Sequence, residues 1–235
     1  MKFRPGYPSS VIAWLREVMG LPPGIVIADV GAGTGISSRF FLDVGCEVFA
    51  IEPNTEMREA AIHQLGLHGS FHAIDGTAEA TGLDARFVDV VVCAQAFHWF
   101  QRQPARHEFT RILKPGGHVV LMWNERELDS TPFLRAYEAM LLRYATDYSQ
   151  VRHENVTHSD LAEFLGQEFQ TASFANEQWF DFEGLRGRLL SCSYAPESGQ
   201  QGHDEMIAEL QRLFDECHEG GQVCFRYQTV VHLGS

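Results

Sequence analysis

Short apolar runs alternate with amphipathic stretches through the first half of this chain. The runs are rich in β-branched residues and predict strands buried on both faces, over 25–30, 46–52, 71–74, 87–93 and 118–123. Apolar residues spaced three and four apart predict helices over 11–18, 34–44, 55–65 and 106–113, with Ser9 or Ser10 capping the first and Asn54 the third. Strands that alternate with helices in this way predict an α/β fold with a parallel sheet.

The pattern changes after Asn124. Residues 125–172 hold two helical patterns and no strand pattern, and the first helix carries an aromatic stripe that includes Phe133, Tyr137 and Tyr144. Later residues predict a strand over 174–182, helices over 185–194 and 203–217, and a last strand over 223–231. A length of 235 residues fits one large α/β domain, so we expect a single domain over 1–235 with 125–172 as an insertion.

Composition narrows the class of protein. The net charge of −13 argues against a broad nucleic-acid surface, which needs clustered Lys and Arg. The first residues form no apolar signal segment, and no apolar run is long enough to cross a bilayer, so we expect a cytoplasmic protein with no membrane partner. The five cysteines form no C-x-x-C pair, so we expect neither a disulfide framework nor a metal site.

The strongest chemical signal lies in residues 25–35. An apolar strand pattern is followed there by Gly31, Gly33 and Gly35. Glycine permits positive φ and a close approach of a ligand to the backbone, and the following helix would point free N–H groups at the turn. A dinucleotide fingerprint would need its third glycine at position 36, which is Ile36. The stretch predicts a cofactor site, with a nicotinamide dinucleotide as one alternative.

The spacing of Gly31, Gly33 and Gly35, with Asp29 two residues earlier, resembles motif I of the class I S-adenosylmethionine-dependent methyltransferases. Three further blocks follow in the order of that family: an acid at the end of the second strand, Asp75-Gly76-Thr77-Ala78-Glu79 after the third, and Gln95-Ala96-Phe97-His98-Trp99-Phe100 after the fourth. The resemblance implies a Rossmann-like, doubly wound seven-stranded sheet, mostly parallel with an antiparallel last strand, and S-adenosylmethionine as cofactor.

Two further segments are similar to those of one subgroup. Residues 4–8 look like an Arg-Pro-x-Tyr-Pro lead-in, and Lys114-Pro115-Gly116-Gly117 looks like the turn that precedes the fifth strand. The subgroup is the type 11 methyltransferases, which act on small molecules and include trans-aconitate methyltransferases. The resemblance implies a small-molecule acceptor. In that family, insertions such as 125–172 often form a lid over the substrate. Packing in a core or interface is the alternative for the aromatic stripe of this insertion.

The resemblance also implies which residues hold the cofactor. Glu52 lies where a carboxylate accepts hydrogen bonds from both ribose hydroxyls. Met57 packs on the adenine or, alternatively, in the core. Thr77 stands near the position where the family usually has Asp, which leaves the adenine contact of this loop open. The expected cofactor set is Tyr7, Asp29, Gly31, Gly33, Thr34, Gly35, Glu52, Pro53, Met57, Thr77, Ala78, Gln95, Ala96 and His98.

The expected catalytic residues are His98 and Trp99, which would face the cofactor and the methyl acceptor. A structural cap on the sheet edge is the alternative for Trp99 and Phe100. A phenol or amine acceptor would need a base, for which His98 is the candidate, whereas a carboxylate would not. An acidic acceptor would need a cation, and the candidates are Arg4, Arg102 and Arg126. An NAD-dependent oxidoreductase and a non-catalytic S-adenosylmethionine-binding protein are the alternative functions.

Overall fold

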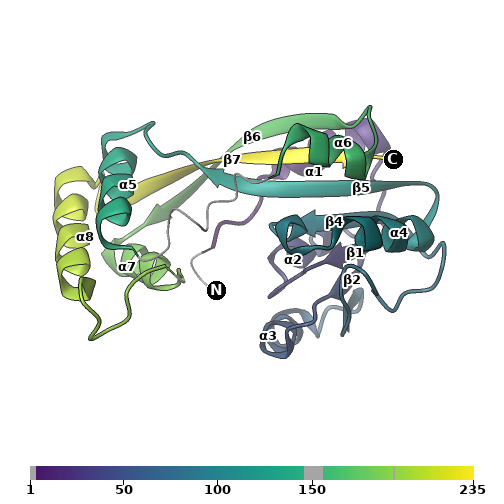
Figure 1. Ribbon diagram of the computed structural model, residues 1–235, viewed down its shortest axis with the longest axis horizontal. Coiled ribbons are helices and arrows are strands. Elements are labelled where there is room, and N and C mark those ends of the chain that lie inside the picture. Colours follow the sequence, from purple (N-terminus) through teal and green to yellow (C-terminus); the bar gives the residue numbers. More distant parts are fainter. Residues whose placement is uncertain (1–3, 146–155, 193) are drawn as a thin grey trace. The chain divides into compact units, whose positions relative to one another are not determined.

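A computed structural model describes residues 4–145, 156–192 and 194–235. Seven strands form one sheet in the order β3-β2-β1-β4-β5-β7-β6, with β7 running against its neighbours (Figure 1). This is the predicted doubly wound topology. The strands are β1 Val26–Val30, β2 Glu47–Ile51, β3 Phe71–Ile74, β4 Val88–Ala94, β5 Leu113–Arg126, β6 Gln170–Phe180 and β7 Val223–Gly234.

Helices connect the strands. They are α1 Ser9–Met19, α2 Ile36–Leu42, α3 Thr55–Leu65, α4 Arg102–Ile112, α5 Pro132–Tyr144, α6 His158–Leu165, α7 Phe182–Leu190 and α8 His203–Cys217, with a 3-10 turn, η1, at Phe97–Trp99. Asn54 caps α3 as predicted, because its side chain accepts a hydrogen bond from the Met57 amide. The predicted Ser caps of α1 are wrong, because Pro8 takes the capping position and Ser9 is already helical.

The parallel strands send successive side chains to opposite faces of the sheet. Along β4, Val90 and Val92 join one apolar cluster and Val91 and Cys93 join the other. Helices α1, α2 and α3 cover the first face, and α4 and α6 cover the second. Burial on both faces explains why these strands are apolar almost throughout.

The segment Lys114–Gly117 is part of a strand. The sequence predicts a turn here before the fifth strand, but the segment lies inside β5. Leu113 pairs with Val88 and His118 pairs with Val90, so four residues of β5 oppose the single residue Asp89. Gly116 has φ +79°, which the bulge requires. The strand therefore starts earlier than the apolar run that predicted it.

The described residues form two compact units, and the single domain over 1–235 with 125–172 as an insertion stays a prediction. The sheet unit takes its described residues from 6–124, 155–174 and 229–235, and the helical unit from 1–5, 125–154 and 175–228. Helix α6 belongs to the sheet unit, because Leu161, Phe164 and Leu165 pack with the second face of the sheet. Residues 146–155 of the predicted insertion lie outside the described residues, and a lid function for 125–172 stays a prediction.

The helical unit has its own core. The apolar stripe predicted on α5 packs against α7, α8 and the first residues of β7. Tyr137 stacks edge-on against Phe225 with ring centroids 5.0 Å apart, and Phe133 does so at 5.4 Å. The stripe is therefore core packing of this unit, as the alternative interpretation held.

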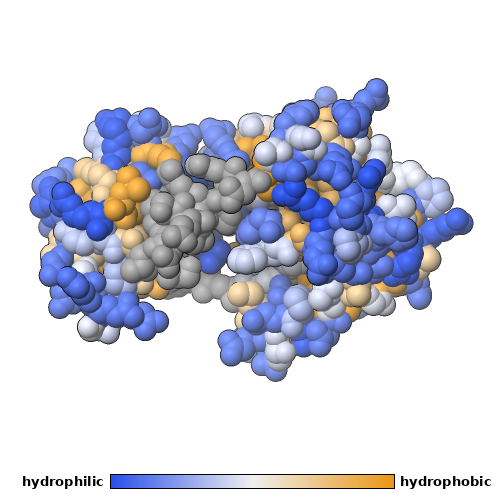
Figure 2. Space-filling view, in the orientation of Figure 1, coloured by the Kyte–Doolittle hydropathy of each residue, from blue (hydrophilic) through white to orange (hydrophobic). Residues whose placement is uncertain are grey.

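The drawn face of the molecule is mostly hydrophilic, with hydrophobic areas between the charged side chains (Figure 2). This agrees with the high content of acidic residues. In the part of the chain that the structure describes, no helix combines the length and apolar character that a bilayer crossing requires.

The core position of α1 leads to a first prediction. Leu15 is fully buried against the sheet, whereas Leu67 is fully exposed. Leu15→Ala leaves a cavity, so we expect it to lower the free energy of unfolding by about 2–5 kcal/mol. Leu67→Ala is the matched control and should change this free energy by less than about 0.5 kcal/mol. Urea unfolding followed by circular dichroism measures both; equal effects would contradict the assignment of α1 to the core.

Candidate active site

Four neighbouring strand ends form the candidate site. Strands β1, β2, β3 and β4 are parallel, so their carboxyl ends share one edge of the sheet. Open α/β sheets bind ligands at this edge, beside the point where the strand order reverses. Each of these strands is followed there by a loop with predicted site residues. The sheet unit alone supplies all of these loops.

The glycine turn after β1 leaves space at one position. Gly31, Gly33 and Gly35 all have positive φ, at +72°, +56° and +86°. A Cβ on Gly31 would lie 2.5 Å from the Cβ of Ala96, and one on Gly35 would lie 2.7 Å from Cδ1 of Leu65. These two glycines therefore permit packing within the protein. A Cβ on Gly33 would meet nothing within 4 Å, which leaves room for a ligand against the backbone.

Asp29 lies at the end of β1 and is fully buried. Its Oδ2 accepts hydrogen bonds from the hydroxyls of Ser37 at 2.7 Å and Ser38 at 2.6 Å, both on α2. Its Oδ1 is buried and has no hydrogen-bond partner among the described residues. Burial raises the pKa of the Asp29 carboxyl to about 6, against the lowering effect of the two serines. A buried acceptor without a partner is costly unless a ligand donates to it.

Tyr7 lies beside Asp29. Its ring is 5.6 Å from that of Phe40, and burial followed by the charge of Asp29 raises the pKa of its phenol above the usual value. The Asn124 side chain donates a 3.0 Å hydrogen bond to the carbonyl of Gly6, which ties this N-terminal segment to the end of β5. The lead-in predicted from sequence is therefore joined to the site by a residue that sequence reasoning did not select.

Glu52 links two of the loops. Its Oε2 accepts a 2.8 Å hydrogen bond from the amide of Gly33, and its Oε1 accepts a 2.9 Å hydrogen bond from the amide of Asn54. The residue is nearly buried. A carboxylate oxygen accepts more than one hydrogen bond, so both oxygens keep the capacity to bind donors of a ligand. The backbone thus fixes the orientation of this carboxylate at the edge of the open space over Gly33.

Arg58 holds the segment after β2. Its Nη1 donates to the carbonyls of Glu52 at 2.7 Å and Pro53 at 3.2 Å, and its Nη2 lies 3.3 Å from Asp75 in the loop after β3. Met57, one helical turn into α3, is 47% exposed. The alternative that Met57 packs in the core is therefore wrong, and its adenine contact stays a prediction.

The loop after β3 is a short hairpin. The amide of Thr77 donates to the carbonyl of Ala80, and the amide of Ala80 donates back to Thr77. Ala78 at its tip is buried. Glu79 accepts a 2.8 Å hydrogen bond from the amide of Gln101, where α4 begins. The hairpin is therefore tied to the loop after β4.

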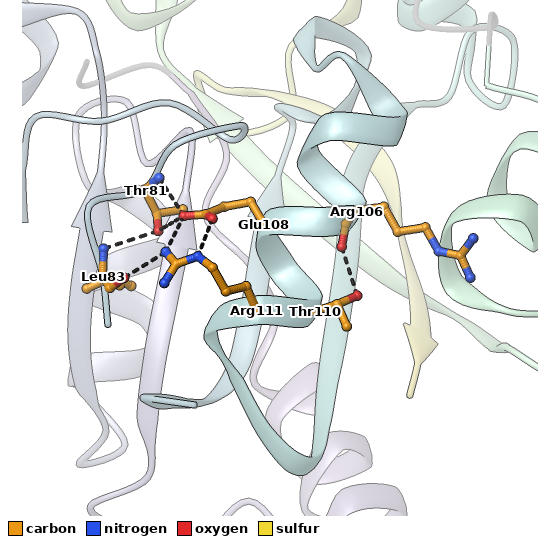
Figure 3. Close-up of polar contacts among 6 residues, drawn as sticks. All are labelled: Thr81, Leu83, Arg106, Glu108, Thr110 and Arg111. Atoms are coloured by element: carbon orange, nitrogen blue, oxygen red, sulfur yellow. Dashed lines mark hydrogen bonds and ion pairs between the residues drawn. The ribbon is translucent and has the colours of Figure 1, made fainter. Parts of the chain in front are cut away.

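A buried carboxylate anchors the base of this hairpin (Figure 3). Glu108 of α4 accepts hydrogen bonds from the amide and hydroxyl of Thr81 at 2.9 and 2.6 Å. Arg111 pairs with both oxygens of Glu108 and donates to the carbonyl of Leu83. The hydrogen bonds from Arg111, together with those from Thr81, lower the pKa of Glu108 to about 2. Three hydrogen bonds between the loop and the helix thus converge on one acid and its arginine.

The loop after β4 begins with a strained residue. Gln95 has φ +61°, a conformation that side chains other than glycine rarely adopt. Its amide bonds to the carbonyl of Met122 on the neighbouring strand, which holds the backbone in place. The turn brings Ala96 against Gly31 and inserts Phe97, fully buried, into the second apolar face. Such strain at a strand end is typical of functional loops.

His98 and Trp99 follow on η1. Phe97 fills the core, so the next two residues project away from it: His98 is partly buried and Trp99 is 79% exposed. The His98 ring lies 4.8 Å from the Trp99 ring. Trp99 is therefore no cap on the sheet, while Phe100 packs edge-on against Phe97 and Phe109.

Known proteins were then compared with the chain. Residues 28–121 match the methyltransferase domain family. An uncharacterized methyltransferase-like protein of Schizosaccharomyces pombe is 34% identical over 97% of this chain and 89% of its own length. An uncharacterized methyltransferase of Mycobacterium bovis is 39% identical over 89% of this chain and 80% of its own length. A candidate type II methyltransferase of Anaeromyxobacter dehalogenans shares the fold, with a TM-score of 0.74, 22% identity, and coverage of 99% and 97% of the two chains.

The chain belongs to the class I S-adenosylmethionine-dependent methyltransferases. This decides against the nicotinamide alternative, and S-adenosylmethionine is the cofactor of the family. The residues of this methyltransferase fit that cofactor. The space over Gly33 is open, the carboxylate of Glu52 is oriented at its edge, and Asp29 offers a buried oxygen without a partner among the described residues.

Two of the three predicted substrate arginines of the methyltransferase have carboxylate partners. Arg102 pairs with Asp160 and lies over the Phe97 ring, within the sheet unit. Arg126 pairs with Glu138 within the helical unit. Arg4 is exposed. The pairs with Asp160 and Glu138 were not predicted, because the partners come from helices distant in the sequence.

The sheet unit brings the predicted cofactor residues to one edge, on the loops after four strands and the lead-in at Tyr7. These residues are Tyr7, Asp29, Gly31, Gly33, Thr34, Gly35, Glu52, Pro53, Met57, Thr77, Ala78, Gln95, Ala96 and His98. Sequence reasoning missed Ser37 and Ser38, although two serines in the buried turn of an apolar helix were a usable signal. It also missed Asn124 and Glu108, for which the sequence carries no local signal.

The buried acid of α4 gives a prediction with a pH dependence. Glu108 has a pKa of about 2 in the fold against an ordinary value of 4.5, so its stabilising effect is present above pH 4.5 and is lost as the pH falls toward 2. We expect Glu108→Gln to lower the free energy of unfolding by about 2 kcal/mol at pH 7. The difference from the wild type should shrink as the pH falls from 5 to 3.

Urea unfolding at several pH values measures this difference. Glu59→Gln, an exposed acid of α3, is the control and should show almost no difference at any pH. A Glu108→Gln effect that stays constant from pH 7 to pH 3 would contradict the ion pair as its cause.

Proposed function

We propose that this methyltransferase moves a methyl group by in-line displacement to a small-molecule acceptor, with a carboxylic acid as the expected class. The observation that carries the proposal is the oriented Glu52 carboxylate beside the open space over Gly33, next to a loop that presents His98 and the exposed Trp99. Polar groups such as the Glu52 carboxylate suit the nucleoside of the donor, and the aromatic side chains suit the acceptor.

The cofactor would be held by the loops of the sheet unit. Glu52 would accept hydrogen bonds from the ribose hydroxyls, because each of its oxygens is already aligned by one backbone amide. Oδ1 of Asp29 would accept a hydrogen bond from the ammonium of the methionine part, with Tyr7 enclosing it. Met57, Thr77 and Ala78 would line the adenine side. Gln95 and Ala96 would line the methionine side.

The residues of this chain would bind, align and exclude water. S-adenosylmethionine supplies an activated methyl group on its sulfonium, so no further activation of the donor is needed. Trp99 would cover the acceptor, and His98 would orient it. His98 would act as a base only for a phenol or amine, since a carboxylate is already a nucleophile.

The ion pairs of two of the three candidate arginines weaken the case for them as anchors of an acidic acceptor. Arg102 and Arg126 would have to exchange Asp160 or Glu138 for a substrate carboxylate, and each exchange costs an ion pair. Arg4 is exposed and would give up no carboxylate partner among the described residues.

We propose the cytoplasm as the site of action, which is supported by five cysteines that all remain free thiols. The charge of −13 disfavours a nucleic-acid substrate.

The ribose contact is tested by Glu52→Gln. The amide keeps the shape of the carboxylate but loses the charge and one acceptor oxygen, so we expect the dissociation constant of S-adenosylmethionine to rise about tenfold or more. Titration calorimetry measures it. The control is Glu47→Gln at the start of β2, whose carboxylate contacts His72 instead. Equal affinities for the wild type and Glu52→Gln would reject the ribose contact.

Asp29 makes cofactor binding dependent on pH. With a pKa of about 6, its carboxyl is ionised above pH 6 and protonated below it, where it can no longer attract an ammonium. We expect S-adenosylmethionine to bind about tenfold more weakly at pH 5 than at pH 7.5. Asp29→Asn should bind weakly at both values. If Asp29→Asn keeps the pH dependence of the wild type, another group is responsible.

A further inference from the structure

Arg188, on α7, places a positive charge inside the helical unit. The Nε of Arg188 is buried and has no hydrogen-bond partner among the described residues. Its Nη1 donates to the sulfur of Cys192 at 3.1 Å, and the phenol of Tyr227 lies close enough to interact with its charge. Sulfur is a weak acceptor and a phenol is a neutral one. The guanidinium is therefore held by weak or uncharged partners.

No carboxylate among residues 4–145, 156–192 and 194–235 forms an ion pair with Arg188. The neighbouring guanidinium of Arg126 shows the usual arrangement, since it pairs with Glu138 and lies 5.4 Å over the ring of Tyr137. Both guanidinium groups act on Tyr137 and Tyr227 electrostatically. Arg188 has no such partner among the described residues, which leaves its positive charge uncompensated in a partly buried place.

Two tyrosines lie near this uncompensated charge. Tyr137 comes from α5 and Tyr227 from β7, so two further elements of the helical unit meet α7 here. Burial raises the pKa of both phenols above the usual value, so both stay protonated at neutral pH. The Tyr227 hydroxyl donates a long hydrogen bond of 3.4 Å to Oε1 of Gln178, an acceptor that a carboxylate could replace. Protonated hydroxyls around a guanidinium form a set of donors.

A buried charge without a counter-charge destabilises a fold, and the rule in proteins is that buried charges are paired. A bound carboxylate would supply the counter-charge that Arg188 lacks among the described residues. The guanidinium fork matches a planar carboxylate in geometry. We propose that Arg188, with the hydroxyls of Tyr137 and Tyr227, forms a binding site for the carboxylate of a small molecule. Arg188 was not among the arginines selected from the sequence.

The test measures carboxylate binding to the full chain. Acetate, benzoate, succinate and citrate are titrated by calorimetry at constant ionic strength, and the melting temperature is recorded with each. At least one of them should bind and raise the melting temperature, while its neutral methyl ester should do neither. Arg188→Met should weaken that binding about tenfold or more. Arg186→Met, an exposed arginine on the same helix, is the matched control and should bind as the wild type does.

Two measurements keep the test decisive. Without ligand, Arg188→Met should melt at or above the wild-type temperature, because it removes an uncompensated charge. If Arg188→Met does not fold, Tyr227→Phe keeps the charge, removes one donor and should weaken binding several-fold. The proposal is overturned if none of the four acids binds the wild type, or if Arg188→Met binds them unchanged.

Mass spectrometry asks separately whether an acid that binds the protein is also methylated. With S-adenosylmethionine present, an acceptor carboxylate would attack the methyl carbon as the carbon–sulfur bond breaks, giving a methyl ester and S-adenosylhomocysteine. Binding without ester formation identifies a non-reacting ligand of the same site. Glu52→Gln tests the cofactor site separately, so failure of that site leaves the Arg188 result intact.

Discussion

The hydrogen bond from the amide of Gly33 to the carboxylate of Glu52 is the contact on which the site depends. It joins the turn after β1 to the end of β2, and it requires the backbone of the turn to approach closely. Gly31 makes that approach possible on the other side, because Ala96 occupies the place of its missing side chain. Three loops are therefore held together by backbone and small residues, which leaves the space over Gly33 clear.

Three buried charges in this protein are handled in different ways. Glu108 is surrounded by donors and has a lowered pKa, as expected of an acid that stabilises structure. Asp29 has only two serine donors on one oxygen, and burial raises its pKa toward neutrality. Arg188 has no carboxylate partner among the described residues. The first charge anchors a loop, whereas the other two remain short of partners in a way that suits ligands.

The apolar patterns of the two units build two different kinds of core. The sheet unit uses short apolar strands buried on both faces, and its loops carry the residues predicted to bind the cofactor. The helical unit uses the aromatic stripe of α5, which includes Tyr137, as core, and it places polar groups among the aromatic ones. A helix that looks like a substrate lid in sequence is thus also the centre of a packed unit.

The sequence by itself determined the fold class, all seven strands and the cofactor loops, because apolar periodicity and the spacing of Gly31, Gly33, Gly35 and Glu52 are local signals. The sequence did not predict correctly the features that depend on contacts between distant segments. The bulge at Lys114–Gly117 follows from the register with β4. The position of α6 follows from the packing of its apolar side chains on the second face of the sheet. Only the tertiary structure decided which charges are paired, since the pairing of Arg102 with Asp160, and the lack of a carboxylate partner for Arg188 among the described residues, are set by helices far apart in the chain.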